Sequence, residues 1–236
     1  MSKKKNDVLN FYEIMPKSLI PKYENPNFEI HQMKIPFQAI CIGQTGCKKT
    51  NWLCDLIHKF NNTFGCITII CKDNSEPLYA YLRSKIPDED QLRIIEGIEN
   101  TPQMAELDPE VQHLIVWDDM CIEGKKQHKI VEEYYIRSRK VAKGVSCIYI
   151  SQVFFKIPKS IRLQASYCIL KKVSNTKDLK LILSDYNLGL DLDSLIKLYK
   201  ECTETPDDFL MIDLNSPSEK RFRYNYKNII DINELF

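Results

Sequence analysis

The chain has 236 residues, of which 44% are hydrophobic, and 33 lysines and arginines against 32 acids give it a net charge of +1. This length and composition predict one α/β domain with a sizeable core, and they exclude a disordered or fibrous chain. No apolar run approaches the roughly 20 residues that cross a bilayer, and the basic start, Met1 to Lys5, runs into polar residues. We therefore expect neither a contact with a membrane nor a secretory signal.

Nine cysteines are present, and several lie in apolar, strand-like runs, among them Cys41, Cys66, Cys147 and Cys168. Free cysteine packs like a small hydrophobic residue. The sequence has no CxxC pair and its four histidines are scattered, so a zinc site is not expected. We interpret the cysteines as free thiols in a reducing, intracellular compartment.

Residues 1–34 are predicted to form an extended arm, and residues 35–236 the nucleotide-binding core with its C-terminal helices and strand pair. The arm carries Pro16, Pro21 and Pro26 among mixed polar residues, and it has one predicted strand at Phe28–Met33. Such an arm either packs on a neighbouring subunit or is a loosely ordered terminus.

A strand, a glycine-containing loop and a helix follow one another from Phe37 to Phe60. The apolar run Phe37–Ile42 predicts a buried strand, and Lys49-Thr50 opens the helical pattern after it. These are the parts of a P-loop, in which backbone N–H groups wrap the phosphates, the lysine meets the β and γ phosphates, and the threonine binds Mg²⁺. The alternative is an ordinary strand-turn-helix corner. The residues predicted to contact the nucleotide are Gly43, Gln44, Thr45, Gly46, Cys47, Lys48, Lys49, Thr50 and Asn51.

Lys48 departs from the P-loop pattern G-x-x-x-x-G-K-[ST], which has glycine at this position. A residue with a Cβ narrows the backbone angles where the chain bends around phosphate. Two hypotheses follow: the lysine adds a second positive charge and the enzyme still works, or the loop cannot close on nucleotide.

Strands and helices alternate in the next part of the chain. We predict strands at Cys66–Cys71 and Leu92–Ile95, a helix at Pro77–Ile86, and a short helix within the acidic segment Asn100–Gln112. This alternation is typical of βαβ units with a mainly parallel sheet.

The predicted strand Leu114–Trp117 runs straight into two acids, Asp118 and Asp119. In a P-loop NTPase, the first carboxylate at this place holds the Mg²⁺ water shell and the second polarises the attacking water. Capping of a following helix by aspartate is the alternative. The presence of a P-loop earlier in the chain favours the NTPase interpretation.

A helix at Lys125–Val141, which contains Arg137 and Arg139, precedes a predicted strand at Val145–Ile150. That strand ends in Ser151-Gln152. Ligands of open α/β sheets lie beyond the carboxyl ends of the strands, so Gln152 could sense the γ-phosphate or orient water. Most glutamines are simply surface residues, and this alternative stays open.

The last third of the chain is predicted to complete the sheet and add helices. The predicted elements are a short helix opening at Lys156–Arg162, a strand at Tyr167–Val173, helices at Lys177–Tyr186 and Leu192–Cys202, and strands at Phe209–Leu214 and Phe222–Tyr226.

Charge is unevenly distributed along the chain. Asp88–Asp119 has ten acids and one arginine, whereas Arg137–Lys180 has eleven basic residues and one acid. A basic block of this size is either a solvated face or a surface that follows a phosphate backbone.

With these pieces in place, the chain resembles the FtsK–HerA superfamily of DNA-pumping ATPases over about residues 34–175. Within it, the chain is most similar to the genome-packaging ATPases of large DNA viruses and virophages. The resemblance is carried by MKIPFQAICIGQTGCKKT, HLIVWDDM, YYIRSRKVAKGVSCIYISQVFFKIPKSIR and the strand that follows. It implies a P-loop NTPase fold of the RecA/ASCE-like type, with a central, mainly parallel sheet flanked by helices.

The resemblance also implies roles for single residues. Lys49 and Thr50 take the phosphate and Mg²⁺ roles, Asp118 the second metal contact, Asp119 the activation of water and Gln152 the sensor role. The resemblance makes an arginine finger, offered to the nucleotide of a neighbouring subunit, a candidate role for Arg137, Arg139 and Arg162. Such an arginine raises the rate of well-studied GTPases by roughly 10³- to 10⁵-fold.

The function that the resemblance implies is an ATPase with Mg²⁺ as cofactor, converting ATP and water to ADP and phosphate. It would drive double-stranded DNA through a homo-oligomeric ring, a pentamer or hexamer, and package a viral genome into a capsid. Contacts with the DNA backbone would be non-specific. A capsid or portal protein is a further expected partner, and the expected location is the virus assembly site in the host cytoplasm, with association with the virion as an alternative.

Three alternatives remain on the sequence alone. The chain could bind nucleotide on DNA without efficient hydrolysis, because of Lys48. It could be another motor, a helicase or a conjugation-type pump. It could also be a nucleoside or nucleotide kinase, although such kinases need an arginine-rich lid over the phosphates.

Overall fold

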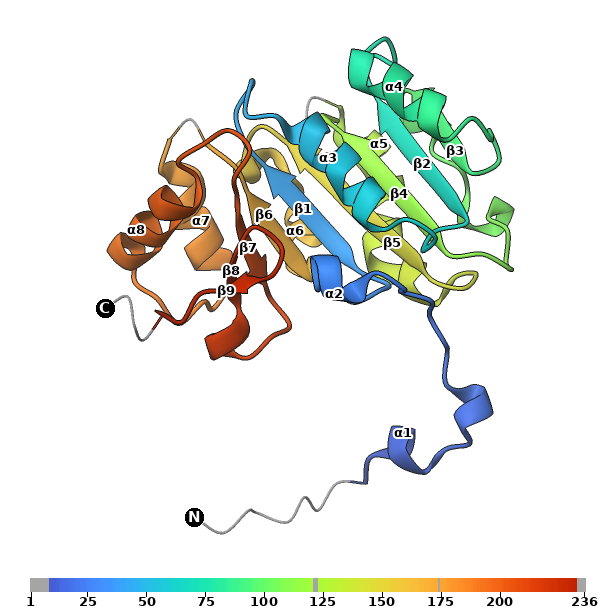
Figure 1. Cartoon of the computed structure of the whole chain (residues 1–236), viewed down its shortest axis with the longest axis horizontal. Coiled ribbons are helices and arrows are strands. Elements are labelled where there is room, and N and C mark those ends of the chain that lie inside the picture. Colours follow the sequence, from blue (N-terminus) through green and yellow to red (C-terminus); the bar gives the residue numbers. More distant parts are fainter. Residues whose placement is uncertain (1–8, 121–122, 174, 233–236) are drawn as a thin grey trace.

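Nine strands form one continuous sheet at the centre of the molecule (Figure 1). The computed structural model describes residues 9–120, 123–173 and 175–232. The sheet order is β3-β2-β4-β5-β1-β6-β7-β8-β9. The first six strands are parallel: β1 Gln38–Ile42, β2 Cys66–Cys71, β3 Leu92–Glu96, β4 His113–Asp118, β5 Val145–Ser151 and β6 Tyr167–Leu170. The last three run antiparallel to their neighbours: β7 Leu210–Asp213, β8 Phe222–Tyr224 and β9 Asn228–Ile229.

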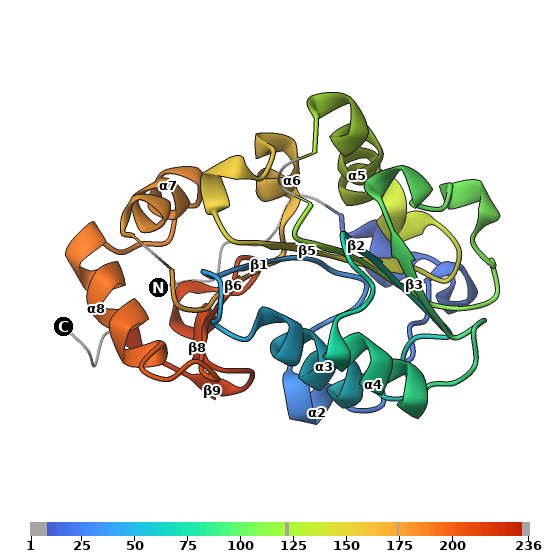
Figure 2. The same ribbon diagram turned by 90° about the horizontal axis from the view of Figure 1, so that it is seen from above.

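Helices cover both faces of the sheet (Figure 2). One face carries α2 Phe28–His31, α3 Lys49–Lys59 and α4 Pro77–Lys85. The other carries α5 Lys125–Arg137, α6 Lys159–Gln164, α7 Lys177–Asp185 and α8 Leu192–Cys202. The small helix α1, Phe11–Ile14, lies on the arm, away from this body (Figure 1). None of the helices in the described ranges is long and apolar enough to cross a membrane.

The core divides into two apolar clusters, one on each face of the sheet. In β1, Ile40 and Ile42 belong to the cluster under α5 to α8, whereas Ala39 and Cys41 belong to the cluster under α3 and α4. Alternate strand residues point to opposite faces, and parallel strands with helices on both faces are apolar throughout. The uninterrupted apolar runs of the sequence therefore form buried central strands.

The order of the strands brings the candidate site together. β5 lies between β1 and β4, with Ile42 beside Ser151 and Asp118 beside Ile150. Because these strands are parallel, their carboxyl ends meet at one edge of the sheet. The loops after them are neighbours although more than 100 residues separate the first from the last along the chain.

The predicted strands and helices of the core are present with small shifts at their ends. The helix predicted to reach Val141 ends as α5 at Arg137 and continues as a 3-10 turn over Ser138–Lys140. Within the acidic segment, the short helix is a 3-10 turn, Met104–Glu106. Strand β9 was not predicted, because its two residues give no period to detect. The division of the chain at residue 34 stays a prediction.

The strand predicted at Phe28–Met33 is wrong, because this segment forms the helix α2, Phe28–His31. Its alternation of apolar and polar residues imitates a strand. The His31 ring is buried and packs on Phe60, just after α3, with 3.8 Å between the ring centroids. This burial favours the helix over the strand. Gln32, with φ of 54°, then ends it in the left-handed conformation.

The thiols behave as small core groups. The eight cysteines of the described ranges form no disulfide, and seven of them are buried. Burial raises the pKa of Cys147 to about 12 and that of Cys71 to about 11. These thiols therefore stay protonated and unreactive at neutral pH.

We expect His31 to make the fold sensitive to acid. Burial, with a smaller contribution from Lys59, lowers its pKa from 6.5 to about 4, and its Nδ1 accepts a hydrogen bond from the Met33 N–H at 3.0 Å. Below pH 6.5 the unfolded chain binds a proton that the folded protein excludes, so stability falls as the pH approaches 4. The free energy of unfolding in urea should be roughly 2 to 3 kcal/mol lower at pH 4.5 than at pH 7.5 from this residue. His31→Gln should flatten that part of the pH dependence, and an unchanged slope would contradict the assignment.

Candidate nucleotide-binding site

The P-loop is anchored to the ends of two neighbouring strands. The Gly43 N–H donates to the Ser151 carbonyl at 3.1 Å, and the Gln44 N–H donates to the Lys172 carbonyl at 2.7 Å. A Cβ on Gly43 would collide with the Cys47 sulfur and would lie 2.9 Å from the Lys171 Cβ. Glycine is therefore required where β1 turns into the loop.

The loop presents backbone N–H groups that fit an anion. Among the described residues, no backbone oxygen accepts from the N–H groups of Thr45, Gly46 and Lys48. Gly46 has φ of +81° and open space around it, and the first turn of α3 follows with its own unpaired N–H groups. N–H groups at the start of a helix favour phosphate, so these residues fit the nucleotide that the sequence predicts.

Lys49 places its ammonium inside this loop. Its Nζ donates to the carbonyls of Gly43 at 2.8 Å and of Gln44 at 3.1 Å. Both acceptors are weak partners for a full charge, so a phosphate would compete for this cation.

Lys48 occupies the left-handed region, with φ of 59° and ψ of 42°, and directly precedes α3. This backbone explains why the P-loop pattern has glycine here, since other residues lose roughly 1 to 2 kcal/mol in this conformation. Its side chain reaches Asp207, with Nζ 2.7 Å and 3.0 Å from the two carboxylate oxygens.

Asp118 is the last residue of β4 and is partly exposed. It accepts a hydrogen bond from the Tyr79 hydroxyl of α4. Burial raises the pKa of Asp118, while the Tyr79 hydrogen bond and the charge of Lys49 oppose that rise. The described residues hold no cluster of three or more histidine, cysteine or acidic side chains that could bind a metal. Mg²⁺ in nucleotide sites takes one or two carboxylates plus phosphate oxygens and waters, so Asp118 with the Thr50 hydroxyl is a suitable donor set.

Asp119 and Gln152 are joined by hydrogen bonds that extend to the P-loop. The Gln152 Nε2 donates to the Asp119 carboxylate at 3.0 Å, and the Thr45 hydroxyl donates to Gln152 Oε1 at 3.2 Å. Lys72, directly after β2, adds an ammonium 3.9 Å from the same carboxylate. The second acid, the glutamine and the loop therefore form one polar line across the sheet edge.

The three arginines lie in different surroundings. Arg137 and Arg139 are exposed at the end of α5, where the Ser138 hydroxyl donates to the Val145 carbonyl at the start of β5. They lie at the sheet edge opposite their own P-loop. Arg162 is buried, pairs with Asp185 and lies with its guanidinium carbon 4.8 Å from the centre of the Phe154 ring. Arg137 and Arg139 are thus the two whose side chains reach solvent.

Replacing Arg162 with alanine is expected to destabilise the fold. The change would leave the Asp185 carboxylate, whose side chain is 6% exposed, buried without its partner. Removing one partner of a buried pair costs about 3 to 5 kcal/mol. Thermal and urea unfolding should show this loss, whereas the exposed control Arg137→Ala should unfold like the natural chain. Equal stability of the two variants would contradict a structural role for Arg162.

The structure divides the basic block of the sequence. Arg162 and Lys171 are buried. Arg139 and Lys140 lie before β5, and Lys156 and Lys159 lie beyond its other end. The block is therefore not one continuous face.

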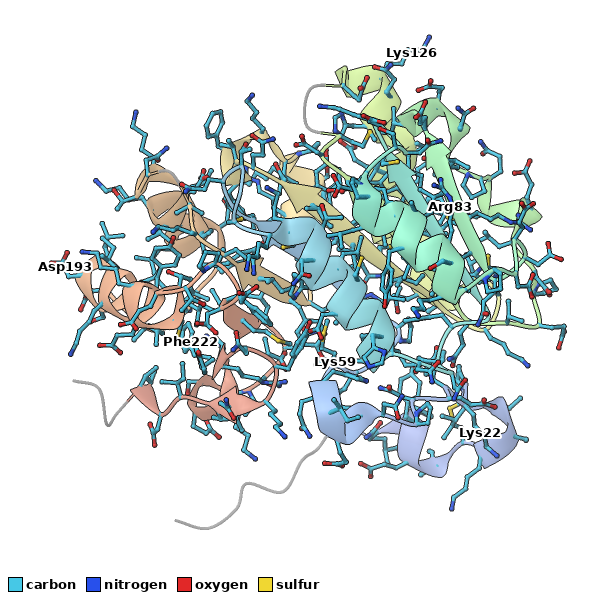
Figure 3. All side chains as sticks on the ribbon, turned by 45° about the horizontal axis from the view of Figure 1, so that its top comes forward. Lys22, Lys59, Arg83, Lys126, Asp193 and Phe222 are labelled. Carbon is cyan, nitrogen blue, oxygen red and sulfur yellow. The ribbon has the colours of Figure 1, made fainter. Side chains whose placement is uncertain are left out.

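A cleft of about 720 Å³, lined by more basic than acidic side chains, lies where the start of α5 faces the segment before α6. Figure 3 shows Lys126 pointing outward at its rim. Its exposed cations are Lys126, Lys129, Lys156 and Lys159, and the exposed ring of Phe155 lies among them.

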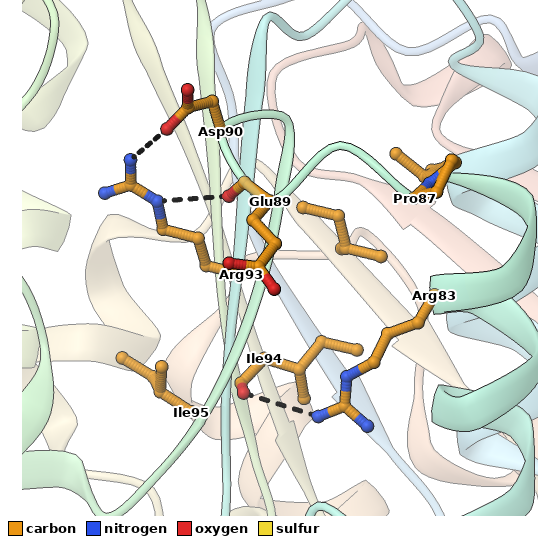
Figure 4. Close-up of a pocket in the computed structure, with 9 residues that line it drawn as sticks. Arg83, Pro87, Glu89, Asp90, Arg93, Ile94 and Ile95 are labelled. Carbon is orange, nitrogen blue, oxygen red and sulfur yellow. Dashed lines mark hydrogen bonds and ion pairs between the residues drawn. The ribbon is translucent and has the colours of Figure 1, made fainter.

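The cleft between α4 and β3 is not a candidate for the nucleotide (Figure 4). It lies at the edge of the sheet. Its arginines are paired internally, Arg93 with Asp90 at 3.2 Å and Arg83 with the Ile94 carbonyl at 3.4 Å. These pairs leave it without the converging donors of the P-loop.

Four residues of the site were missed by sequence reasoning: Lys72, Tyr79, Lys171 and Asp207. Lys72 directly follows a parallel strand, as Asp119 and Gln152 do, and that position was a usable signal. Lys171 has the same signal, because it directly follows the parallel strand β6. Tyr79 and Asp207 reach the candidate site from a helix and a loop that are distant in the sequence, and no local pattern indicates this.

The chain matches the family model described as Poxvirus A32 protein over residues 27–224. A search of curated proteins found no match.

The fold is similar to those of several solved structures. The genome packaging NTPase B204 from Sulfolobus turreted icosahedral virus 2, in complex with ATP-gammaS, is 14% identical, with 84% of this chain and 100% of that chain covered and a TM-score of 0.57. ATPases 2 and 3 of EssC from Geobacillus thermodenitrificans are 11% identical, with 85% and 42% covered and a TM-score of 0.54. The pCW3 conjugation coupling protein TcpA, in monomer form with ATPgS, is 13% identical, with 84% and 62% covered and a TM-score of 0.52.

The fold predicted from the sequence, a mainly parallel sheet flanked by helices as in P-loop NTPases, is confirmed by these structures. The resemblance stated from the motifs is confirmed at the level of family and fold. Because the family match spans most of its length, the chain belongs to the Poxvirus A32 protein family.

Proposed function

We propose that this chain is an ATP-driven motor that moves double-stranded DNA and packages a viral genome into a capsid, at the site of virus assembly. One observation carries the proposal: in a member of this family, hydrogen bonds join Thr45 of the P-loop, Gln152 after β5 and Asp119 after β4, beside Asp118 at the end of β4. The structural likeness to B204, which is named as a genome packaging NTPase, supports the same function.

The P-loop would hold the phosphates through the N–H groups of Thr45, Gly46, Lys48 and the first turn of α3, and through the ammonium of Lys49. Asp118 and Thr50 would hold the Mg²⁺ that neutralises charge on the phosphate oxygens. The anchoring of the loop to Ser151 and Lys172 keeps its donors in place before nucleotide arrives, so little ordering is needed on binding.

Asp119 would accept a proton from the attacking water. Gln152 would orient both the water and the Asp119 carboxylate. The carboxylate already accepts from the Gln152 amide, and the amide oxygen accepts from Thr45 of the P-loop. A general base has to lie within hydrogen-bonding reach of the proton it removes. Gln152 therefore links the state of the P-loop to the orientation of the base.

A ring of subunits would complete the site. Arg137 and Arg139 lie at the edge away from their own P-loop, which suits delivery to the nucleotide of a neighbour. The arm leaves the body at this edge, where Tyr23 and Arg139 line one cleft. It carries large apolar side chains that are more than 60% exposed: Leu9, Phe11, Tyr12, Ile14 and Leu19. Burial of these side chains on a neighbouring subunit would stabilise the ring.

The cleft between α5 and α6 is the surface we assign to the DNA backbone. Four exposed lysines surround it, and it begins three residues after Gln152, at Phe155. Contacts of this type neutralise phosphates and carry no sequence information. Movement of the Gln152 segment during hydrolysis would therefore move the DNA contact.

DNA binding and DNA-stimulated phosphate release test this function. We expect ATP turnover to rise with double-stranded DNA of any sequence. Replacing Lys156 and Lys159 with glutamine should reduce the slope of log affinity against log salt by roughly 2, because each lost phosphate contact removes about 0.9. The matched control replaces the exposed Lys220 and Lys227, far along the chain. Salt-insensitive or sequence-selective binding would contradict the assignment.

The second candidate is a nucleotide-binding module on DNA with impaired hydrolysis. Lys48 favours it, because a left-handed lysine stands where the P-loop pattern has glycine. Phosphate release separates the two: a folded protein that binds ATP and DNA but releases no phosphate would establish the module.

A further inference from the structure

Lys48 and Asp207 form a contact that ties the P-loop to the loop before β7. The Lys48 Nζ lies within hydrogen-bonding distance of both carboxylate oxygens, at 2.7 and 3.0 Å, and 159 residues separate the two along the chain. Both side chains are about half exposed, so the attraction between their charges is moderate. The place of the contact matters more than its strength.

Asp207 lies in a turn that hydrogen bonds of its neighbour Asp208 hold in place. The neighbouring Asp208 carboxylate accepts from the hydroxyls of Thr205 and Tyr224, each at 2.7 Å, and from the Asn225 amide at 3.1 Å. These bonds fix the turn to β8 and the residue after it. The Asp207 carboxylate is therefore presented to Lys48 by a rigid neighbour.

The same aspartate makes a second contact to the base of the P-loop. Its carbonyl accepts from the Nζ of the buried Lys171, at 3.2 Å. Lys171 directly follows β6, and its N–H donates to the Ile42 carbonyl at 2.8 Å, at the point where β1 enters the loop. Asp207 thus holds the loop at both ends, through Lys171 at its start and Lys48 at its end.

The backbone explains why such a contact is needed. Lys48 is left-handed, a conformation that glycine adopts freely and that lysine avoids. An ion pair that forms only when the side chain points toward Asp207 favours this conformation over the extended alternatives. The N–H of Lys48 and the first turn of α3 are then kept in the arrangement that phosphate requires.

We propose that Asp207 is a positioning residue for the phosphate-binding loop, acting through Lys48, and that the pair replaces the conformational freedom of the missing glycine. The inference rests on the proposed binding of ATP at this loop. It makes Lys48 a partner of the C-terminal strands and not a second phosphate ligand. Its characteristic consequence is that the Asp207 carboxylate matters only while residue 48 is lysine.

A double-mutant cycle tests the pair. Asp207→Asn should weaken ATP binding about threefold to fivefold, which is the size of effect expected from a partly exposed ion pair. It should raise KM without changing kcat, because the substitution alters binding and not the chemical step. Asp207→Glu should retain near-natural affinity. Lys48→Gly should bind ATP at least as well as the natural chain, and Asp207→Asn added to it should have no further effect. The matched control is Glu204→Gln, an exposed acid in the same loop.

Hydrogen exchange of the amides of residues 43–50, without nucleotide, gives a readout that does not depend on ATP. Asp207→Asn should speed this exchange by a similar factor in the natural background and not in the Lys48→Gly background. If the natural chain binds no ATP, this pattern would support the contact while the proposed function fails. The inference would be overturned if Asp207→Asn changed neither ATP affinity nor hydrogen exchange, or changed them equally in the natural and Lys48→Gly backgrounds. An equal change from Glu204→Gln would also overturn it.

Discussion

Replacing Lys49 with alanine is expected to abolish ATP turnover, with kcat/KM reduced by about 10²- to 10³-fold or more. The lysine is the cation whose Nζ lies within the loop, held at 2.8 and 3.1 Å by the carbonyls of Gly43 and Gln44. Those contacts hold the ammonium inside the loop before phosphate arrives, and phosphate oxygens would replace the two carbonyls as its partners. Removing one preorganised donor to developing charge typically lowers kcat by about 10²- to 10³-fold, and a full charge is a stronger donor.

Phosphate release and the affinity for a fluorescent ATP analogue should be measured together. Both should fall, because Lys49 would contact phosphate in the ground state as well as in the transition state. The matched control is Lys59→Ala at the other end of the same helix, which removes an i,i+4 pair with Asp55. Turnover of Lys49→Ala close to that of this control would show that hydrolysis does not occur at this loop.

The central strands could be predicted because each is a short apolar run that ends in polar residues. Parallel strands covered on both faces carry little other than apolar side chains. The local sequence is therefore enough to predict β1, β2, β4 and β5. Helix α2 was misread because four residues are too few for a helical period to outweigh an accidental alternation.

Part of the candidate site could be predicted because its residues lie at the ends of strands or directly after them. Gly43 and Gln152 directly follow β1 and β5, Asp118 is the last residue of β4, and parallel topology brings the ends of these strands to one edge. Tyr79 and Asp207 reach the same place from a helix and from a loop near the C-terminus. Their positions depend on how helices and strands pack, which the local sequence does not encode.

The charge pattern misled for a similar reason. Eleven basic residues in Arg137–Lys180 are contiguous in sequence, yet the chain crosses the whole sheet within this stretch, along β5 and back along α6. Neighbouring cations were thereby carried to opposite edges, and Arg162 and Lys171 into the interior. A linear count of charge indicates a surface only when the segment stays on one face.

Replacing Asp119 with asparagine is expected to stop hydrolysis while ATP is still bound, with kcat lowered by about 10²- to 10⁴-fold, the usual contribution of a general base. Asparagine has the size of aspartate and can still accept a hydrogen bond from Gln152, but it cannot take a proton from water. Asp119 also has φ of 57°, and asparagine is among the residues that tolerate this left-handed conformation best. The fold and the P-loop should therefore be unaffected.

The diagnostic result for Asp119→Asn is a separation of binding from chemistry. ATP affinity and unfolding temperature should match the natural chain, while single-turnover phosphate release should be lost, in contrast to Lys49→Ala, which loses both binding and turnover. Asp118→Asn provides the comparison at the metal position, where turnover should fall together with the dependence on Mg²⁺. If Asp119→Asn hydrolyses ATP at the natural rate, the water is activated elsewhere, and the hydrogen bonds that join Thr45, Gln152 and Asp119 would then serve to position the loop and not to catalyse the reaction.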